Sequence, residues 1–238
     1  MATIDLNLPA GVSWTAWEKP AEQARGLAAK VAQELRAALA ERGRALLAVS
    51  GGRSPVAFLE ALSAEQLEWS KVTVTLVDER WVPESHPDSN AGLVRRHLLR
   101  GAAANAVFCG LYQPAASLEA AAERAERQLA ELALPIDVLV LGMGDDGHTA
   151  SLFPGSPGLA EALDPAATRR CLPGWAPSVP HQRLTFSRAA LAGARVQLLQ
   201  LQGPAKLATL RAALADNDEK HMPVRAFLRA PLSIHWCP

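Results

Sequence analysis

Hydrophobic positions along the chain follow two spacings, and each spacing predicts one kind of element. Apolar residues recur every four positions between residues 27 and 39, which predicts a helix that begins at Pro20 and ends at Gly43. Further helices are predicted at residues 55–62, 91–99, 117–132, 203–215 and 223–228. Apolar or alternating runs predict strands at residues 44–50, 71–77, 136–141, 195–201 and 232–236, after a strand-like segment near the amino terminus. Because strands alternate with helices, we expect an α/β fold with a mostly parallel central sheet flanked by helices.

The composition is that of an ordinary globular protein. Its 238 residues are 49% apolar and 20% charged, and no linker, repeat or low-complexity tract divides them, so a single domain over residues 1–238 is expected. Twenty-four basic residues balance 24 acidic ones, which leaves no charge footprint for nucleic acid or an anionic membrane. An anionic ligand must therefore be bound by a local cluster of charges.

Three widely spaced cysteines, none in a C-x-x-C pair, suggest neither a disulfide framework nor a zinc site. The amino terminus has no basic region followed by an apolar core, and no apolar run approaches membrane length. We therefore expect a cytoplasmic protein, and no obligatory protein partner is evident from the sequence.

The candidate chemistry centres on residues 141–155, which follow the predicted strand 136–141. Glycines at positions 142, 144 and 147 allow a tight turn at the carboxyl end of that strand, where open α/β sheets place their functional residues. His148 lies just past the turn, and Asp145 and Asp146 precede it. A histidine held beside a carboxylate is the usual general acid/base pair near neutral pH. The alternative, a turn with an incidental histidine, stays open on this stretch alone.

Three better-known motifs do not fit these residues. Residues 142–147 match the dinucleotide pattern G-x-G-x-x-G, but two carboxylates inside the loop would repel a pyrophosphate, and Pro154 would end any helix that could bind one. An EF-hand would need acidic residues at 142 and 144 and a glutamate in place of Phe153. The chain contains no G-x-S-x-G elbow, which argues against a serine hydrolase of the α/β-hydrolase type.

A second candidate site follows the predicted strand 44–50, where Ser50, Gly51, Gly52, Arg53 and Ser54 lead into a helix. We expect Ser54 to cap that helix and the proline at position 55 to occupy its first turn. Free backbone N–H groups and the positive end of the helix dipole would then form an anion site. A plain connection between strand and helix is the alternative, and Arg53 favours the anion.

Further charges are candidates for the same ligand. Lys206 lies in the first turn of a predicted helix, where a cation is disfavoured unless something negative binds there, so it is a candidate phosphate ligand or else a surface lysine. Asp78 and Arg80 follow the predicted strand 71–77. Asp78 either holds the loops or contacts sugar hydroxyls, and Arg80 either binds the ligand or forms a structural ion pair. Arg183 is a further candidate, or it caps the proline-rich loop at residues 172–180.

Taken in order, these motifs resemble the 6-phosphogluconolactonase family over nearly the whole chain. The motifs are Ser50-Gly-Gly-Arg-Ser-Pro55, Asp78-Glu-Arg-Trp-Val-Pro83, Asp88-Ser-Asn90, the run from Leu141 to Pro154, Arg183-Leu-Thr185 and Gly203-Pro-Ala-Lys206. The resemblance implies a Rossmann-like fold of the glucosamine-6-phosphate deaminase type. It also implies hydrolysis of the small-molecule substrate 6-phospho-D-glucono-1,5-lactone to 6-phosphogluconate, the second step of the oxidative pentose phosphate pathway, without a metal or cofactor.

Two other functions are alternatives to this one. Glucosamine-6-phosphate deaminase is similar in fold, but its histidine loop carries a glutamate that helps to open the sugar ring, and Phe153 stands in that place here. A non-catalytic sugar-phosphate sensor would keep the phosphate turn without needing His148 and Asp146, and would normally carry a partner domain. Phe153 favours the lactonase over the deaminase.

The resemblance implies a mechanism in which neutral His148 activates a water that attacks the lactone carbonyl. Asp146 would orient the ring and stabilise the imidazolium, and donors from the glycine turns or an arginine would stabilise the oxyanion. The turn at residues 50–54 would bind the 6-phosphate together with Arg80, Arg183 and Lys206. We expect surface or loop positions for the other histidines, although the loop that carries His181 could close over the substrate.

Overall fold

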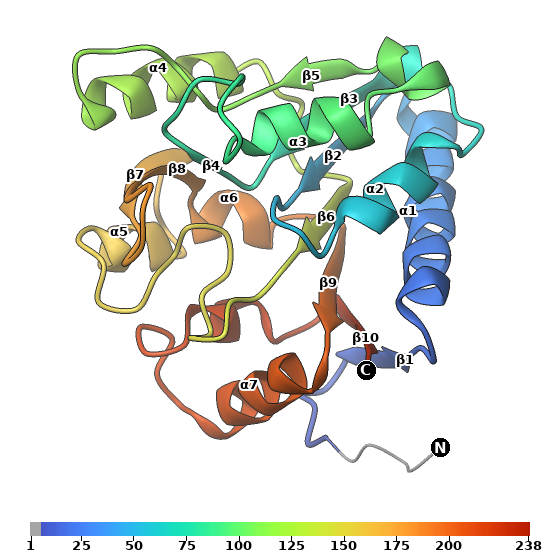
Figure 1. Ribbon diagram of the computed structural model, residues 1–238. Helices are drawn as coiled ribbons and strands as arrows, with labels where there is room; N and C mark the ends of the chain where they lie inside the picture. The colour runs from blue at the N-terminus through green and yellow to red at the C-terminus, as the bar shows by residue number, and fades with distance from the viewer. Residues whose placement is uncertain (1–5) are drawn as a thin grey trace.

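A computed structural model describes residues 6–238 of the chain, and its centre is a seven-stranded sheet in which every pair of neighbouring strands is parallel (Figure 1). The strand order is β1-β10-β9-β6-β2-β3-β5. The strands are β1 (Ser13–Ala16), β2 (Ala45–Val49), β3 (Val72–Leu76), β5 (Val107–Cys109), β6 (Val138–Leu141), β9 (Val196–Gln202) and β10 (Leu232–Cys237). The expected α/β fold with a mostly parallel central sheet is therefore confirmed.

Helices flank this sheet, and several begin or end where the sequence predicts. The α-helices are α1 (Pro20–Arg42), α2 (Val56–Ser63), α3 (Asn90–His97), α4 (Leu118–Leu129), α5 (Leu159–Leu163), α6 (Arg188–Ala192) and α7 (Pro204–Ala215), and η3 (Pro223–Phe227) is a 3-10 helix. Gly43 ends α1 in the left-handed conformation, and the Ser117 side chain caps α4. No helix within residues 6–238 is long and apolar enough to cross a membrane.

The order of the strands creates one switch point in the sheet. From β2 the chain moves outward through β3 to β5, and then returns to β6 on the other side of β2 and moves outward through β9 and β10. Crossovers on the two sides therefore diverge between β2 and β6, and a crevice is expected outside the carboxyl ends of these strands. The loops that follow β2 and β6 are the two candidate sites from the sequence.

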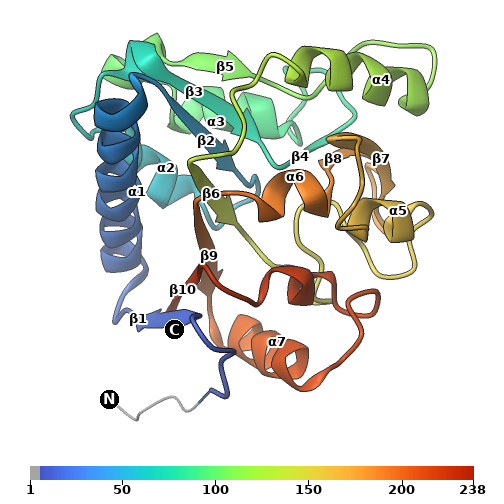
Figure 2. The same ribbon diagram turned by 180° about the vertical axis from the view of Figure 1, so that it is seen from behind.

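A small antiparallel sheet, absent from the sequence prediction, lies on the side of the central sheet opposite α1 (Figures 1 and 2). Its order is β4-β8-β7, with β4 at Asp78–Arg80, β7 at Cys171–Trp175 and β8 at Gln182–Phe186. The chain leaves β3 after one residue to form β4, so Asp78 and Arg80 belong to the second sheet. We expected a proline-rich loop where β7 lies; this was wrong because Pro173 is on an edge strand, where a missing N–H is tolerated.

Two local expectations were also wrong. The structure begins α2 at Val56, with Pro55 preceding the helix and Ser54 making no capping hydrogen bond. His235, expected at the surface or in a loop, lies on β10 and is 5% exposed. It accepts a hydrogen bond from the Trp17 indole, and burial lowers its pKa to about 4. The amino-terminal strand expected from the sequence corresponds to β1, while residues 1–5 lie outside the described part.

Candidate functional site

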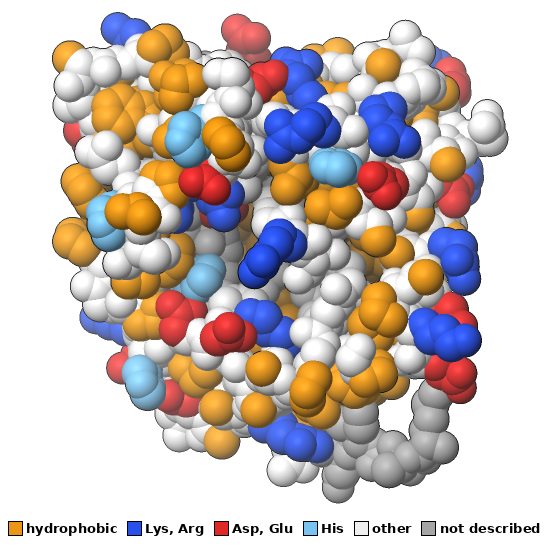
Figure 3. All heavy atoms as spheres, in the orientation of Figure 1, with side chains coloured by type: hydrophobic (Ala, Val, Ile, Leu, Met, Phe, Trp, Pro, Cys, Tyr) orange, Lys and Arg blue, Asp and Glu red, His pale blue; other side chains and the backbone are white. Residues whose placement is uncertain are grey.

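A cavity of about 230 Å³ opens at the carboxyl ends of β2, β6 and β9. Figure 3 shows this face of the molecule, where Lys and Arg side chains and a histidine gather around a central hollow. The lining combines both candidate loops with residues from β4, α3, β9 and α7. Its polar members are Ser50, Arg53, Ser54, Asp78, Arg80, Asn90, His148, Thr149, Gln200, Gln202 and Lys206.

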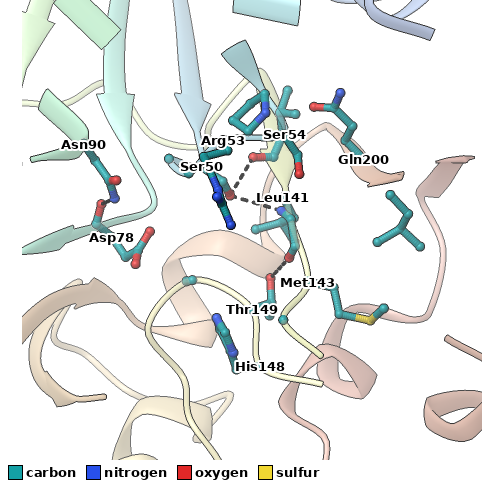
Figure 4. Close-up of a pocket in the computed structure, with 18 of the residues that line it drawn as sticks. Ser50, Arg53, Ser54, Asp78, Asn90, Leu141, Met143, His148, Thr149 and Gln200 are labelled. Atoms are coloured by element: carbon teal, nitrogen blue, oxygen red, sulfur yellow. Dashed lines mark hydrogen bonds between the residues drawn. The ribbon is translucent and has the colours of Figure 1, made fainter. Parts of the chain in front are cut away.

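The turn between β2 and α2 forms one wall of the cavity (Figure 4). The Ser50 hydroxyl donates to the Val140 carbonyl at 3.1 Å and accepts from the Gly142 N–H at 3.1 Å, so it ties this turn to the end of β6. The backbone N–H groups of residues 51–54 donate no hydrogen bond within residues 6–238. Arg53 is exposed and has no ion-pair partner in the same described range. An anion would therefore find unpaired donors here.

The histidine loop holds the predicted acid–base pair, His148 and Asp146, in contact. The Nδ1 atom of His148 lies 2.5 Å from Oδ1 of Asp146, and the same oxygen accepts the backbone N–H of His148 at 3.0 Å. Partial burial raises the pKa of Asp146, but the hydrogen bond and charge of His148 outweigh it, so the pKa lies below its usual value. The Phe153 ring packs against the imidazole, with ring centroids 4.3 Å apart. Two neighbours therefore fix the orientation of the imidazole.

Gly144 is required for this close approach. Its N–H donates to the His148 carbonyl at 2.8 Å, which folds the loop back on itself. A Cβ atom at position 144 would lie 2.0 Å from Nδ1 of His148 and 2.7 Å from Oδ1 of Asp146. Any larger residue would therefore displace the pair.

Asp78 lies on the wall of the cavity opposite Gln200 (Figure 4). It is held there by side chains from two other segments. Its Oδ2 atom accepts the Ser151 hydroxyl at 2.6 Å, and its backbone carbonyl accepts the Asn90 amide at 2.9 Å. The neighbouring Glu79 is buried and accepts the N–H groups of Asn90 at 2.8 Å and Ala91 at 2.7 Å. Burial raises the pKa of Glu79 to about 7, against the effect of these hydrogen bonds. Glu79 thus anchors α3 behind Asp78 and does not line the cavity.

The four predicted cations occupy different positions. Arg53, Arg80 and Lys206 line the cavity, and Lys206 forms an ion pair of 2.7 Å with Asp145. Arg80 donates to the Asp88 carbonyl at 2.5 Å and forms no ion pair with Asp78 or Glu79. Arg183 faces Arg80 across β4 and β8 but does not line the cavity, and it donates to the Pro180 carbonyl. Burial and the nearby Arg80 lower the pKa of Arg183.

Four polar residues of the cavity were missed by the sequence reasoning: Asn90, Thr149, Gln200 and Gln202. A signal existed for the two glutamines, because they alternate with Leu199 and Leu201 at the carboxyl end of a predicted strand. Asn90 is the first residue of α3. It reaches the cavity because its side-chain amide donates to the carbonyl of Asp78 on β4, a contact that only the tertiary structure creates. Residues 6–238 contain no cluster of three or more histidine, cysteine or acidic side chains that could hold a metal ion.

Fold and cavity together define an α/β protein with a polar small-molecule pocket at the switch point of a parallel sheet. Residues 18–236 match the family described as glucosamine-6-phosphate isomerases/6-phosphogluconolactonase. The chain belongs to this family. It is 75% identical to a 6-phosphogluconolactonase of Pseudomonas aeruginosa over the full length of both proteins. The crystal structure of a 6-phosphogluconolactonase from Shewanella baltica OS155 is 38% identical and superimposes with a TM-score of 0.93, covering 98% of this chain and all of that one. The resemblance inferred from the motifs is confirmed.

The deaminase branch of the family has the same architecture. The structure of a monomeric glucosamine-6-phosphate deaminase matches with a TM-score of 0.78 at 19% identity, covering 94% of this chain and 97% of that one. At this identity the likeness shows the fold alone.

Proposed function

We propose that this protein hydrolyses 6-phospho-D-glucono-1,5-lactone to 6-phospho-D-gluconate, the second step of the oxidative pentose phosphate pathway. The names of the similar proteins support the substrate, and the contact between His148 and Asp146 beside a cluster of free anion donors carries the chemistry. Every group that the proposal uses comes from residues 1–238, which we propose act as one domain.

His148 is the general base in this proposal. Because Asp146 accepts a hydrogen bond from the Nδ1 side of the ring, the neutral imidazole carries its proton on Nδ1 and leaves Nε2 free. Nε2 removes a proton from a water molecule while the water oxygen forms a bond to C1 of the lactone. The negative charge of Asp146 stabilises the resulting imidazolium, and such a positioned pair typically contributes 10²–10⁴-fold in rate.

The tetrahedral intermediate then needs donors for its oxyanion and a proton for its leaving group. The N–H groups of Gly142 and Gly144 already donate to Ser50 and to the His148 carbonyl, so an arginine at the cavity, Arg80 or Arg53, is the better candidate for the oxyanion. The bond between C1 and the ring oxygen breaks, and the imidazolium returns its proton to that oxygen. The atoms of one water are thereby added across the ester bond.

In this proposal the 6-phosphate binds at the turn of residues 50–54. The free N–H groups of residues 51–54 and the start of α2 offer hydrogen-bond donors on this wall of the cavity. Arg53 adds a guanidinium that can bind a phosphate through two hydrogen bonds. Lys206 reaches the cavity from the first turn of α7 and would share its charge between Asp145 and the phosphate. Arg183 supplies positive charge from behind Arg80 and contacts the ligand only if the β7–β8 loop rearranges.

Phe153 separates this reaction from ring opening of an amino sugar. The aromatic ring packs on the imidazole and supplies no carboxylate to the histidine loop. A lactone is already an activated carbonyl, so water, one base and charge stabilisation are sufficient, whereas the deaminase relay would lack its glutamate.

The test is hydrolysis of freshly generated 6-phosphogluconolactone, corrected for the spontaneous rate, by the wild type and by His148→Ala. Ammonia release from glucosamine 6-phosphate is measured in parallel. We expect lactone turnover that falls at least about 100-fold in the variant, and no ammonia. Ammonia release would refute the inference that Phe153 rules out the deaminase reaction. Binding of sugar phosphate without either reaction would favour a sensor.

A further inference from the structure

Two glutamine side chains on β9 reach the cavity, and neither has a role in the chemistry described above. Gln200 is 5% exposed, and both Gln200 and Gln202 line the cavity beside the end of β6. Because side chains alternate along a strand, both project to the same face of the sheet, where α1 packs. Figure 4 shows Gln200 on the cavity wall near Ser54 and Leu141.

A third glutamine, Gln23 of α1, determines how these two amides are turned. Gln23 is fully buried, and its Nε2 atom donates to the Leu201 carbonyl at 2.8 Å and to the His235 carbonyl at 2.9 Å. Both acceptors are backbone oxygens that can only accept, so the amide of Gln23 cannot be reversed without losing both bonds. Its Oε1 atom must therefore face the two glutamines of β9.

The fixed oxygen of Gln23 in turn orients its neighbours. Oε1 accepts the amide of Gln200 at 3.2 Å and the amide of Gln202 at 3.0 Å. Each of these residues therefore turns its nitrogen toward α1 and its own oxygen away. Neither oxygen accepts a hydrogen bond from residues 6–238, and each keeps access to solvent. The cavity thus presents two carbonyl acceptors whose orientation is dictated by a residue outside it.

Such a pair of acceptors suits hydroxyl groups. An anion would be repelled by two carbonyl oxygens, whereas each hydroxyl of a sugar ring can donate one hydrogen bond to an amide oxygen. We propose that Gln200 and Gln202 recognise hydroxyl groups of the sugar ring, and that Gln23 is the positioning residue that holds both amides in the recognising orientation. This inference rests on the proposed function, since it assigns the hydroxyl contacts of that substrate.

The test uses 6-phosphogluconolactone and its 2-deoxy, 3-deoxy and 4-deoxy analogues, which together remove each ring hydroxyl once. In the wild type we expect kcat/KM to be lower by about tenfold or more for at least one analogue, which is the value of one well-formed hydrogen bond. In the variant that combines Gln200→Leu with Gln202→Leu, this preference should fall to within about threefold of unity. Gln197→Leu is the matched control, because Gln197 is buried on the same strand, donates to the Ala192 carbonyl and does not line the cavity.

Gln23→Met tests positioning. It should lower the same preference through a raised KM with kcat nearly unchanged. Adding it to the variant that lacks both cavity glutamines should cause no further loss of preference. If Gln23→Met does not fold, as judged by circular dichroism, the variant that lacks both cavity glutamines decides the outcome. The inference would be overturned by a wild type that does not discriminate, by equal losses for all four lactones in the variant that lacks both cavity glutamines, or by wild-type selectivity in that variant.

Failure of the proposed function gives a different result. A wild type that turns over none of the lactones refutes the reaction. The hydroxyl contacts are then tested by calorimetric binding of 6-phosphogluconate and its 2-deoxy, 3-deoxy and 4-deoxy counterparts to the wild type and to the variant that combines Gln200→Leu with Gln202→Leu. A wild-type preference that this variant loses would support the recognition of hydroxyls, and an unchanged preference would refute it.

Discussion

Replacing Gly144 with alanine adds a single methyl group at the one point of the histidine loop where the acid–base pair leaves no room for it. The new Cβ would lie 2.0 Å from Nδ1 and 2.1 Å from Cε1 of His148, and 2.7 Å from Oδ1 of Asp146. Gly144 does not have a positive φ angle, so alanine is compatible with the local backbone. The substitution therefore disturbs the contact between His148 and Asp146 without removing any proposed catalytic side chain.

The expected magnitude follows from the contact that is lost. The overlap separates the imidazole from the carboxylate, which now lie 2.5 Å apart, so Asp146 no longer fixes the proton on Nδ1. A positioned acid–base pair contributes 10²–10⁴-fold, and we expect kcat to fall by about that factor, or about 3–5 kcal/mol of barrier. The pKa of Asp146 should rise, because its hydrogen bond to His148 is what outweighs its burial.

The assay is steady-state hydrolysis of 6-phosphogluconolactone, with thermal unfolding measured on the same samples. Gly193→Ala is the control, because Gly193 has a φ of −78° at the end of α6 and the nearest atom to its new Cβ is 4.0 Å away. The control should retain wild-type kcat. If Gly144→Ala is folded and retains more than about a tenth of wild-type kcat, the contact between His148 and Asp146 is not what drives the reaction.

Three further outcomes are expected. Lys206→Met should raise KM at least about tenfold for the phosphorylated lactone and leave hydrolysis of unphosphorylated gluconolactone nearly unchanged, and equal losses would refute the phosphate contact. Glu79→Gln should lower the free energy of unfolding by about 1–3 kcal/mol in urea titrations, because an amide nitrogen replaces an oxygen that accepts backbone N–H groups; an unchanged midpoint would contradict this. The lowered pKa of His235, about 4, means that the unfolded chain binds more protons between pH 4 and 6.5, so this residue's contribution to stability, about 3 kcal/mol, is complete above pH 6.5 and is lost as the pH falls toward 4. His235→Gln should flatten the slope of unfolding free energy against pH in that interval, and an unchanged slope would be evidence against burial as its cause.

Local features of the sequence were sufficient for six of the seven strands of the central sheet and for the histidine loop, whereas the short edge strand β5 was not predicted. The apolar periodicity predicted the six strands because buried strands and amphipathic helices impose different spacings on neighbouring residues. Glycine at position 43 and serine at position 117 marked helix ends through interactions within one turn. Asp146 and His148 are two residues apart, so their contact is also local.

Contacts between distant segments were decided by the tertiary structure. No local pattern predicted that residues 78–80 leave the central sheet and pair with residues 183–185. Nor did any local pattern predict that a proline-containing segment forms the edge strand of a second sheet. Ser151 holds Asp78 across 73 positions of the chain, and Gln23 orients Gln200 across 177.

The sequence by itself therefore determined the fold class, the family and the contact between Asp146 and His148, since these depend on spacing and on motifs within short stretches. Only the tertiary structure decided which cations line the cavity, that Lys206 forms an ion pair with Asp145, and that Gln200 and Gln202 form part of the wall. The physical reason is that hydrogen bonds and ion pairs depend on distances of a few ångströms between groups, and for groups far apart in the chain these distances are fixed only when the helices and strands pack together.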